Sequence, residues 1–153
     1  MADRKAIAAL VLSAAAFVSL IVSEGYTDSA IIPVKGDVPT YGFGTTDGVK
    51  MGDTTNPVAA VRMALRDAEK FEGAIKQCVK VPLSQNEYDA WVKFTYNIGA
   101  SAFCKSTAVR LLNAGNYRGA CDQMLRWVYV KNNKIQGLVN RRKQEHALCI
   151  SDL

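Results

Sequence analysis

Histidine is nearly absent from this sequence of 153 residues, and none of its cysteines stands in a C-x-x-C pair. The single imidazole belongs to His146, which lies in a polar helical stretch where no acid-and-nucleophile constellation is visible, so we expect an ordinary surface side chain. Structural zinc sites take four thiolate or imidazole ligands at close spacing. The sequence therefore predicts no metal site and no cofactor.

Linker-like composition is also missing, because no Gly/Ser tract, proline-rich run or internal repeat interrupts the chain. Apolar residues make up 49% of the sequence and charged residues 22%, which is enough apolar material for a real core. Disorder and a multidomain arrangement are thereby disfavoured. We expect one domain over residues 1–153.

Acidic residues are outnumbered, which gives a formal charge of +5. This balance favours an anionic partner, and nucleic acid, anionic lipid and the bacterial envelope all satisfy it. The densest basic cluster, at 141–143, lies in a helical pattern that also contains Glu145. We interpret this cluster as a solvated helix face rather than a binding patch.

Charge is absent altogether from residues 6–23, which follow Arg4 and Lys5. As one helix these 18 residues would extend about 27 Å, close to the thickness of a hydrocarbon core. The preceding positive charges predict a cytoplasmic N-terminus, with everything after Glu24 on the outer side. Six alanines and three serines make the segment only weakly apolar, so its residence in a membrane should be marginal.

Four interpretations of this segment remain open at the level of the sequence. It could be a secretory signal cleaved near the small residues Ala14 to Ala16, a permanent anchor, a weak anchor that later leaves the bilayer, or a buried first helix. The four cysteines depend on the same question, since thiols stay reduced in the cytosol and form disulfides after export. They are Cys78, Cys104, Cys121 and Cys149.

The remainder of the chain predicts a short β element followed by helices. Residues 26–46 mix β-branched, aromatic, glycine and proline residues, which is typical of a small hairpin sheet. Asn56 and Pro57 begin a long helix, and Ser84 with Glu87 forms a capping-box signature for the next. Further helices are expected from Ser106 or Thr107 to Gly115, over 117–127 and over 138–149. The fold class is thus α+β and predominantly α.

Two sets of apolar residues accompany these helices. In the long helix, apolar side chains recur at helical spacing at Val58, Val61, Leu65, Ala68 and Ile75. Large apolar and aromatic residues further along are better explained by core packing than by a cofactor site. These residues are Trp91, Phe94, Met124, Trp127 and Tyr129.

The stretch EGYTDSAIIPVKGDVPTYGFGTT, residues 24–46, resembles the active-site segment of phage lysozymes of glycoside hydrolase family 24. The resemblance extends through AWVKFTYNIGASAFCKSTAVRLLNAGNYRGACDQMLRWVY and GLVNRRKQEHALC, and so covers most of the chain. It implies a lysozyme-like fold with a hairpin sheet near the N-terminus and a C-terminal helical lobe. It also implies a muramidase that cleaves the β-1,4 bond between N-acetylmuramic acid and N-acetylglucosamine.

The family uses a glutamate, an aspartate and a threonine, commonly spaced Glu-x8-Asp-x5-Thr. Glu24 and Thr40 match this motif, but Pro33 occupies the position of the aspartate. Asp37 is our preferred second carboxylate and Asp28 the reserve. Asp37 lies in a polar turn, which makes a plain turn residue an equally good interpretation.

Glycoside hydrolysis needs a proton donor and a group that handles the positive charge and the water. Glu24 suits the donor, because burial after an apolar helix would raise its pKa. Asp37 beside Lys35 suits an ionised base or stabiliser, and Thr40 suits water positioning. The family resemblance implies inversion at the anomeric carbon. Tyr26, Tyr41, Phe43 and Thr46 are candidates for sugar contacts, with Gly42 and Gly44 as backbone kinks below the cleft.

The resemblance further implies a signal-arrest-release endolysin. Its peptidoglycan substrate would be the anionic partner, with no nucleic acid involved, and the chain would act as a monomer. Residues 6–23 would hold it in the host inner membrane, then leave the bilayer and form the first helix of a periplasmic enzyme. The resemblance pairs Cys78 with Cys104 and Cys121 with Cys149. A non-catalytic peptidoglycan-binding module and a cationic membrane-active protein remain alternatives.

Overall fold

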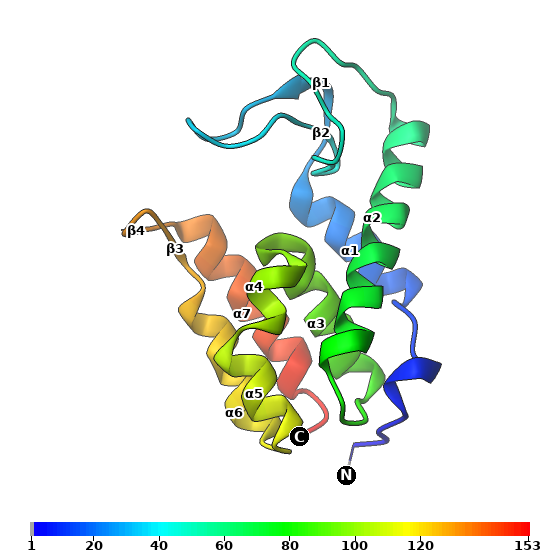
Figure 1. Cartoon of the computed structure of the whole chain (residues 1–153), viewed down its shortest axis with the longest axis vertical. Coiled ribbons are helices and arrows are strands. Elements are labelled where there is room, and N and C mark those ends of the chain that lie inside the picture. The colour runs from blue at the N-terminus through cyan, green and yellow to red at the C-terminus, as the bar shows by residue number, and fades with distance from the viewer. Residues whose placement is uncertain (1) are drawn as a thin grey trace. The chain divides into compact units, whose positions relative to one another are not determined.

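Local capping signals set the ends of several helices in the computed structural model, which describes residues 2–153. Ser84 and Glu87 form the expected capping box at the start of α3, and Ser106 caps α5 through the Val109 amide. The helices are α1 (Ala14–Glu24), α2 (Pro57–Cys78), α3 (Gln85–Ile98), α4 (Ala100–Cys104), α5 (Thr107–Asn113), α6 (Tyr117–Gln123) and α7 (Gln136–Ile150). The strands are β1 (Thr27–Ile31), β2 (Thr40–Gly42), β3 (Tyr129–Val130) and β4 (Asn133–Lys134), and η1 (Ile7–Ala9) and η2 (Met124–Arg126) are 3-10 turns (Figure 1).

The described chain divides into two compact units. The first comprises the residues up to Ala16 together with Phe71–Leu153, and the second comprises Phe17–Lys70. Mostly helical structure with a small antiparallel sheet confirms the expected α+β class. The single domain over 1–153 stays a prediction.

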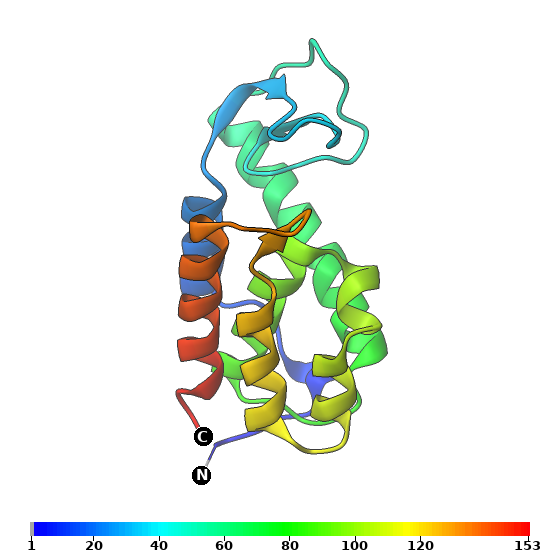
Figure 2. The same cartoon turned by 90° about the vertical axis from the view of Figure 1, so that its left-hand side faces the viewer.

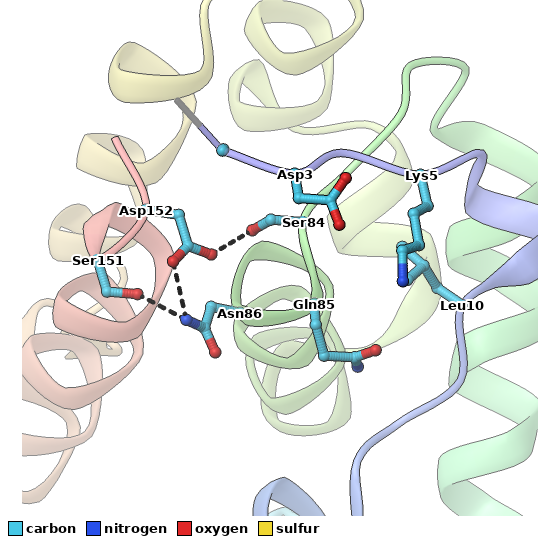
Figure 3. A pocket seen from close by; sticks show the side chains of 9 residues that line it. Asp3, Lys5, Leu10, Ser84, Gln85, Asn86, Ser151 and Asp152 are labelled. Carbon is cyan, nitrogen blue, oxygen red and sulfur yellow. Dashed lines mark hydrogen bonds between the residues drawn. The ribbon is translucent and has the colours of Figure 1, made fainter.

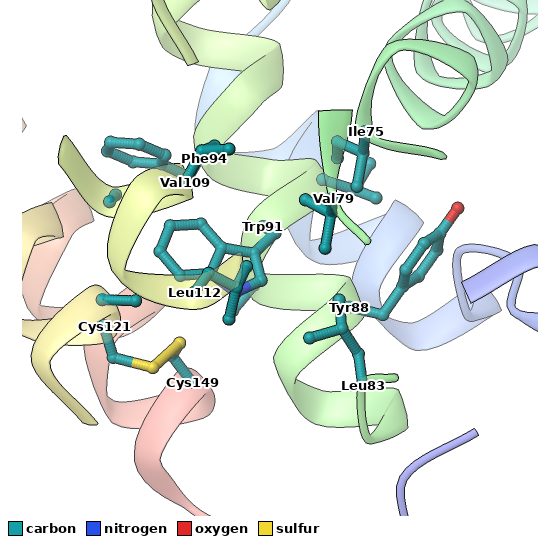
Figure 4. Packing of buried hydrophobic residues seen from close by; sticks show 14 of the residues in the cluster. Ile75, Val79, Leu83, Tyr88, Trp91, Phe94, Val109, Leu112, Cys121 and Cys149 are labelled. Carbon is teal, nitrogen blue, oxygen red and sulfur yellow. A yellow bond between two sulfur atoms is a disulfide. The ribbon is translucent and has the colours of Figure 1, made fainter. Parts of the chain in front are cut away.

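The first unit is organised around α3, whose side chains are buried on all sides over most of its length. Trp91, Phe94 and Phe103 pack as a cluster of rings, with centroid separations of 5.5 to 6.4 Å. Helix α7 packs against α3 and α6, and Figure 2 shows α7 running beside α6. Aliphatic residues from α2 and α5 complete the core around Trp91, as Figure 4 shows.

Two expectations about the first unit are wrong. Tyr129 is 59% exposed rather than part of the core, because it lies on the short β3–β4 hairpin. Arg142, expected on a solvated face, is 1% exposed and pairs with Glu145 at 2.7 Å. Its guanidinium also donates to the Asn97 side chain at 2.8 Å, so a buried polar network holds α7 against α3.

The helix expected over residues 117–127 is shorter, since α6 ends at Gln123 and continues as the 3-10 turn η2. The aromatic and apolar side chains of this stretch nevertheless meet the core. Met124 is fully buried, and the ring of Trp127 packs edge-on against Phe94 with centroids 5.8 Å apart. The residues of this turn therefore contribute side chains to the core although they are not α-helical.

Residues 6–23 do not form one helix. They begin with η1, continue as extended chain through Leu10, and become helical only at Ala14. Ser13 explains the boundary, because its Oγ accepts a hydrogen bond from the Ala16 amide at 3.1 Å in the manner of an N-cap. Leu10 is buried in the core of the first unit at 3% exposure, which fixes the extended stretch before the cap.

The second unit contains the β1–β2 hairpin and the first part of α2. Asn56 caps α2 as expected, since its Oδ1 accepts from the Ala59 amide at 3.0 Å. The buried stripe of this helix is made by Ala60, Ala64 and Ala68, whereas Val58 and Leu65 are 64% and 48% exposed. At Ala60 the small side chain lets the hairpin approach closely, since a β-carbon on Gly42 would lie 3.0 Å from Cβ of Ala60.

Two disulfides join the cysteines, Cys78 with Cys104 and Cys121 with Cys149, and these are the pairs that the family resemblance implies. Both lie in the first unit. Cys121 and Cys149 are buried in its core beside Trp91 and Leu112 (Figure 4). Within residues 2–153, no helix combines the length and the apolar character needed to span a bilayer.

Candidate active site

Glu24 is the last residue of α1, and its side chain is partly buried. The segment that meets its carboxylate comes from beyond the hairpin, at Gly44. A β-carbon on Gly44 would lie 3.1 Å from Oε2 and 3.5 Å from the carboxyl carbon of Glu24. The φ angle of Gly44 is +83°, a conformation that residues with a side chain rarely adopt. Glycine thus allows the backbone to pass directly against the acid.

A tight turn over residues 41–45 presents Gly44 in this way. The amides and carbonyls of Tyr41 and Thr45 exchange two hydrogen bonds of 3.1 Å. Thr45 is buried, and its hydroxyl donates to Oδ2 of Asp67 on α2 at 2.8 Å. Burial raises the pKa of Asp67, and the hydrogen bond from Thr45 acts in the opposite direction. The turn that faces Glu24 is therefore tied to a long helix through one buried hydroxyl.

The hairpin itself holds the other sequence-predicted residues. In its register Thr27 pairs with Gly42 and Ile31 pairs with Thr40, so Thr40 lies at the end of the ladder farther along β1 from Glu24. Thr40 is partly exposed and its hydroxyl donates to the Val38 carbonyl at 3.2 Å. The hydroxyl is thus near the loop of residues 32–39 that joins the two strands.

Asp37 lies in that loop and is exposed. Its Oδ1 accepts a hydrogen bond from the Val38 amide at 2.9 Å, and its own amide donates to the Val34 carbonyl. Asp37 and Thr40 consequently bind opposite ends of the Val38 residue, one its amide and the other its carbonyl. The structure links these two residues to each other, and links Glu24 to Gly44.

The reserve carboxylate, Asp28, is exposed on β1. Its backbone carbonyl accepts from the Thr55 amide at 2.8 Å, and its side chain is within 3.4 Å of the Ser29 hydroxyl. These contacts attach β1 to the segment before α2. They place Asp28 on the strand, between Glu24 and the loop that contains Asp37.

The aromatic side chains of the expected sugar-binding set lie in or next to the strands of the hairpin: Tyr26 precedes β1, Tyr41 is in β2 and Phe43 follows β2. The rings of Tyr26 and Phe43 are in contact, with centroids 5.3 Å apart, and Tyr26 remains 40% exposed. Tyr41 is partly exposed and Thr46 exposed. Exposed aromatic faces next to a carboxylate can pack on pyranose rings.

Thr45 and Asp67 carry no motif of their own and were not among the residues predicted from the sequence. Thr45 stands between Gly44 and another threonine, and Asp67 is one of several charged residues in α2. Asp47 and Lys70 were not predicted either; they form an exposed ion pair of 2.9 Å between the segment after the turn and α2. A periodicity argument could have found Asp67, because it follows Ala60 and Ala64 near the buried stripe of the helix.

The chain is similar to known proteins over most of its length. A family model described as phage lysozyme matches residues 22–145, which include the hairpin and most of the first unit. The SAR-endolysin of Pseudomonas phage phiKMV is 38% identical over 141 residues, covering 90% of this chain and 87% of that protein. Both matches include Glu24 within a nearly full-length similarity.

Solved structures show the same fold. The endolysin of Escherichia coli O157:H7 phage FAHEc1 has a TM-score of 0.80 and 37% identity, covering 95% of this chain and 96% of that one. The muramidase domain of SpmX from Asticaccaulis excentricus has a TM-score of 0.83 and 27% identity, covering 92% and 97%. The family match and these relatives show that the chain belongs to the phage lysozyme family and is an endolysin-type glycoside hydrolase.

Proposed function

We propose that the chain is a muramidase, which hydrolyses the β-1,4 bond between N-acetylmuramic acid and N-acetylglucosamine in bacterial peptidoglycan and so lyses the host cell at phage release. The observation that carries the proposal is the Glu24 carboxyl at the end of α1, packed against the glycine turn at residue 44. One solved neighbour with 27% identity is itself named a muramidase domain.

Glu24 is the general acid in this proposal and protonates the leaving glycosidic oxygen. The C-terminal end of a helix carries partial negative charge, which favours the protonated form of a carboxyl placed there. A second group must then stabilise the oxocarbenium-like charge or activate water. Asp37 takes that role and Thr40 holds the water, supported by the loop geometry that joins both to Val38.

Inversion at the anomeric carbon belongs to the same proposal. An inverting enzyme needs room for a water between its two carboxyl groups. Asp37 lies on an exposed loop rather than in the ladder beside Glu24, which is consistent with such a separation. Proton NMR of the first product anomer during hydrolysis of a soluble muropeptide oligomer distinguishes inversion from retention.

The decisive experiment compares reducing-sugar release from purified peptidoglycan by the wild type and by Glu24→Gln. The substitution keeps the size of the side chain and removes its proton-donating role, so we expect a loss of at least about 100-fold. Retained binding to insoluble peptidoglycan and an unchanged melting temperature show that the variant is folded. Undiminished sugar release would remove Glu24 from the reaction, and cell clearing without sugar release would favour membrane disruption.

The second carboxylate is identified by a matched pair. We expect Asp37→Asn to lower kcat strongly and Asp28→Asn to leave it nearly unchanged, with the reverse result assigning the role to Asp28. Thr40→Ala and Thr40→Ser complete the set, because serine retains the hydroxyl that positions water. An activity loss that serine fails to restore would point to packing rather than to water.

The N-terminal segment belongs to the proposal as well. Residues 6–23 enter the host inner membrane with the N-terminus in the cytoplasm, later leave it, and fold with the enzyme in the periplasm. The phiKMV relative is named a SAR-endolysin. Support also comes from the hydrogen bonds that residues 4–13 make to acidic side chains in the folded chain. A segment inserted in the membrane would leave those acidic side chains without these partners.

Three acidic side chains of the first unit accept hydrogen bonds from residues 4–13. Arg4 donates to the fully buried Glu87 at 2.8 and 3.0 Å, and also stacks over the Tyr117 ring. The Leu12 amide donates to Glu72 at 2.6 Å. The Ser13 amide and hydroxyl donate to the two oxygens of Asp89 at 3.0 and 2.7 Å. A chain cleaved near Ala16 would lose all three sets of contacts.

Backbone pairing adds to the side-chain contacts. Lys5 and Leu83 exchange two backbone hydrogen bonds of 2.8 and 3.0 Å. Beside this pairing, a cavity of about 430 Å³ separates residues 2–10 from the start of α3 and the C-terminal turn (Figure 3). There Asp152 accepts from both Ser84 and Asn86. Residues near both ends of the described chain thus form hydrogen bonds at the start of α3.

Release is tested at Ala14 and Ala15, which are exposed in the folded chain. Replacing both with leucine makes the segment more apolar without a clash in the core, so we expect membrane retention and delayed lysis. Replacing both with glutamine is the matched control and should leave lysis prompt. Lysis timing that is the same in both variants would contradict release. Sedimentation of the purified enzyme tests the proposed monomer.

A further inference from the structure

Between Asp122 and Glu145 the sequence contains six basic residues and no acidic residue. Arg142 is buried and neutralised by Glu145, so it adds nothing to the surface. Four others, at the end of η2, on the β3–β4 hairpin and in α7, are exposed: Arg126, Lys131, Lys134 and Lys143. None of these four makes an ion pair within residues 2–153.

Apolar side chains are exposed on the same stretch. Tyr129 is 59% exposed, Leu125 41%, Ile135 40% and Val130 37%. The β3–β4 hairpin has strands of only two residues, and its turn residues Lys131 and Asn132 have φ angles of +47° and +67°. This short exposed hairpin thus presents apolar side chains at Tyr129 and Val130 and basic side chains at Lys131 and Lys134.

A hollow lies beside the hairpin within the first unit. Its volume is about 630 Å³, and its wall combines cations with aliphatic and aromatic carbon. The exposed cations are Arg126, Lys134 and Lys143, which reach it from η2, β4 and α7. Arg142 also lines the hollow, but it is buried and paired with Glu145. Leu125, Val128, Tyr129 and Val139 supply the apolar wall. The hollow can therefore bind a ligand that carries anionic oxygen atoms next to a hydrocarbon part.

We propose that this surface, defined by Leu125, Arg126, Tyr129, Lys131, Lys134 and Lys143 and called the hairpin surface, binds anionic phospholipid at a bilayer face. Lipid phosphates would occupy the cationic rim of the hollow, since guanidinium and ammonium groups are the usual partners of phosphate. Tyr129 and Leu125 would enter the interface, where amphipathic aromatic residues concentrate. A purely acidic polymer would use the cations but would leave the exposed apolar side chains without a partner.

The hairpin surface is separate in sequence from residues 6–23 and from Glu24. It therefore gives the folded enzyme a second means of contacting a membrane, whichever side chains perform hydrolysis. Cations near an anionic bilayer each strengthen binding about fivefold at ordinary ionic strength. The exposed cations should act together, and binding should weaken as salt is added.

The test measures sedimentation of the full-length protein with vesicles of phosphatidylglycerol and phosphatidylcholine, and with vesicles of phosphatidylcholine alone. We expect binding only to the anionic vesicles. Lys131→Gln with Lys134→Gln should lower the partition coefficient about 25-fold. The matched control is Lys105→Gln with Arg110→Gln, which removes the same charge from exposed positions elsewhere in the first unit and should change it less than about twofold.

Tyr129→Ala separates interfacial insertion from charge. It should weaken vesicle binding at high salt, where the electrostatic contribution is screened. Sugar release from soluble peptidoglycan fragments and the melting temperature should be unchanged in all these variants. Equal losses in both charge variants would reduce the effect to net charge. Unaltered vesicle binding with reduced binding to insoluble peptidoglycan would assign the surface to an acidic polymer and overturn the lipid proposal.

Discussion

At the scale of single residues, Gly44 lies against Glu24, the proposed general acid. Gly44 has a left-handed φ angle, and a side chain there would press on Oε2 of Glu24. Gly48 provides a comparison at nearly the same conformation, with φ of +72° and no atom within 4 Å of the place that a β-carbon would occupy. The two glycines therefore separate backbone strain from displacement of the acid.

We predict that Gly44→Ala and Gly48→Ala each lower the free energy of unfolding by about 1 kcal/mol, because alanine is strained at positive φ. Only Gly44→Ala should also lower kcat, by about tenfold or more, since its methyl group displaces the carboxyl of Glu24. Urea unfolding and reducing-sugar release measure the two effects. Equal kcat in the two variants would show that Gly44 does not position the acid.

Glu24 could be predicted as the candidate acid from the sequence, because its E-G motif follows an uncharged run. Thr45 and Asp67 could not be predicted as partners, because their hydrogen bond depends on the path of the chain after the hairpin. The burial of Arg142 was not predicted either, since nothing in a run of three basic residues shows which side chain points into the core. Burial of a single charge is decided by the partner helix, not by its neighbours in sequence.

At the scale of elements, the start of α1 depends on Ser13. Its hydroxyl accepts from the Ala16 amide and donates to Asp89, so one side chain caps the helix and attaches it to α3. We predict that Ser13→Ala lowers the melting temperature by about 3 to 6 °C, from the loss of a cap and of a hydrogen bond to a charged group. Differential scanning calorimetry measures the change.

Ser101→Ala is the matched control for this prediction, because Ser101 is exposed at the start of α4, whose N-cap is Gly99. Its melting temperature should stay within about 1 °C of the wild type. A comparable decrease in both variants would mean that Ser13 contributes no more than an ordinary surface serine.

Elements with a local capping signal were predictable from sequence, as α2, α3 and α5 show. The elements that were missed lack such a signal. Helix α4 has five residues and no side-chain cap, and the β3–β4 hairpin turns through Lys131 and Asn132 rather than through glycine. Residues 6–23 were expected as one helix because an apolar run gives no hint that Leu10 is buried before the helix begins.

At the scale of the whole molecule, both disulfides cross-link the first unit, closing loops with sequence separations of 26 and 28. Each should stabilise the fold by about 3 kcal/mol through the unfolded state. We predict a larger loss for Cys121→Ala with Cys149→Ala than for Cys78→Ala with Cys104→Ala. The first pair is fully buried in the core, so its removal also leaves a cavity.

Urea unfolding of the two double variants measures this difference, and the wild type in reductant gives the combined effect. Equal losses would indicate that chain entropy alone accounts for both bonds. A larger loss at Cys78 and Cys104 would show that the core beside Trp91 relaxes around the missing sulfur atoms.

The charge network between α3 and α7 makes stability depend on pH. Burial raises the pKa of Glu145 to about 7, although Arg142 opposes the shift. A folded-state pKa above the unfolded value means that the folded chain holds this proton more tightly. The contribution is complete below about pH 4.5 and is lost as the pH rises towards 7, by at most about 3 kcal/mol.

We therefore predict that the free energy of unfolding falls more steeply between pH 4.5 and 7 in the wild type than in Glu145→Gln. Glu69→Gln, an exposed control on α2, should keep the slope of the wild type. Parallel slopes in all three proteins would remove Glu145 as the source of the pH dependence.

If the N-terminal segment is released as proposed, the ion pair between Arg4 and Glu87 connects lysis timing to fold stability at one position. In the proposed sequence of states, the same guanidinium first sets the orientation of the N-terminal segment and later closes on a buried acid. A mutation of Arg4 that changes the delay before lysis would also change the durability of the mature enzyme. Selection on the phage life cycle should consequently constrain this surface arginine as tightly as a residue of the core.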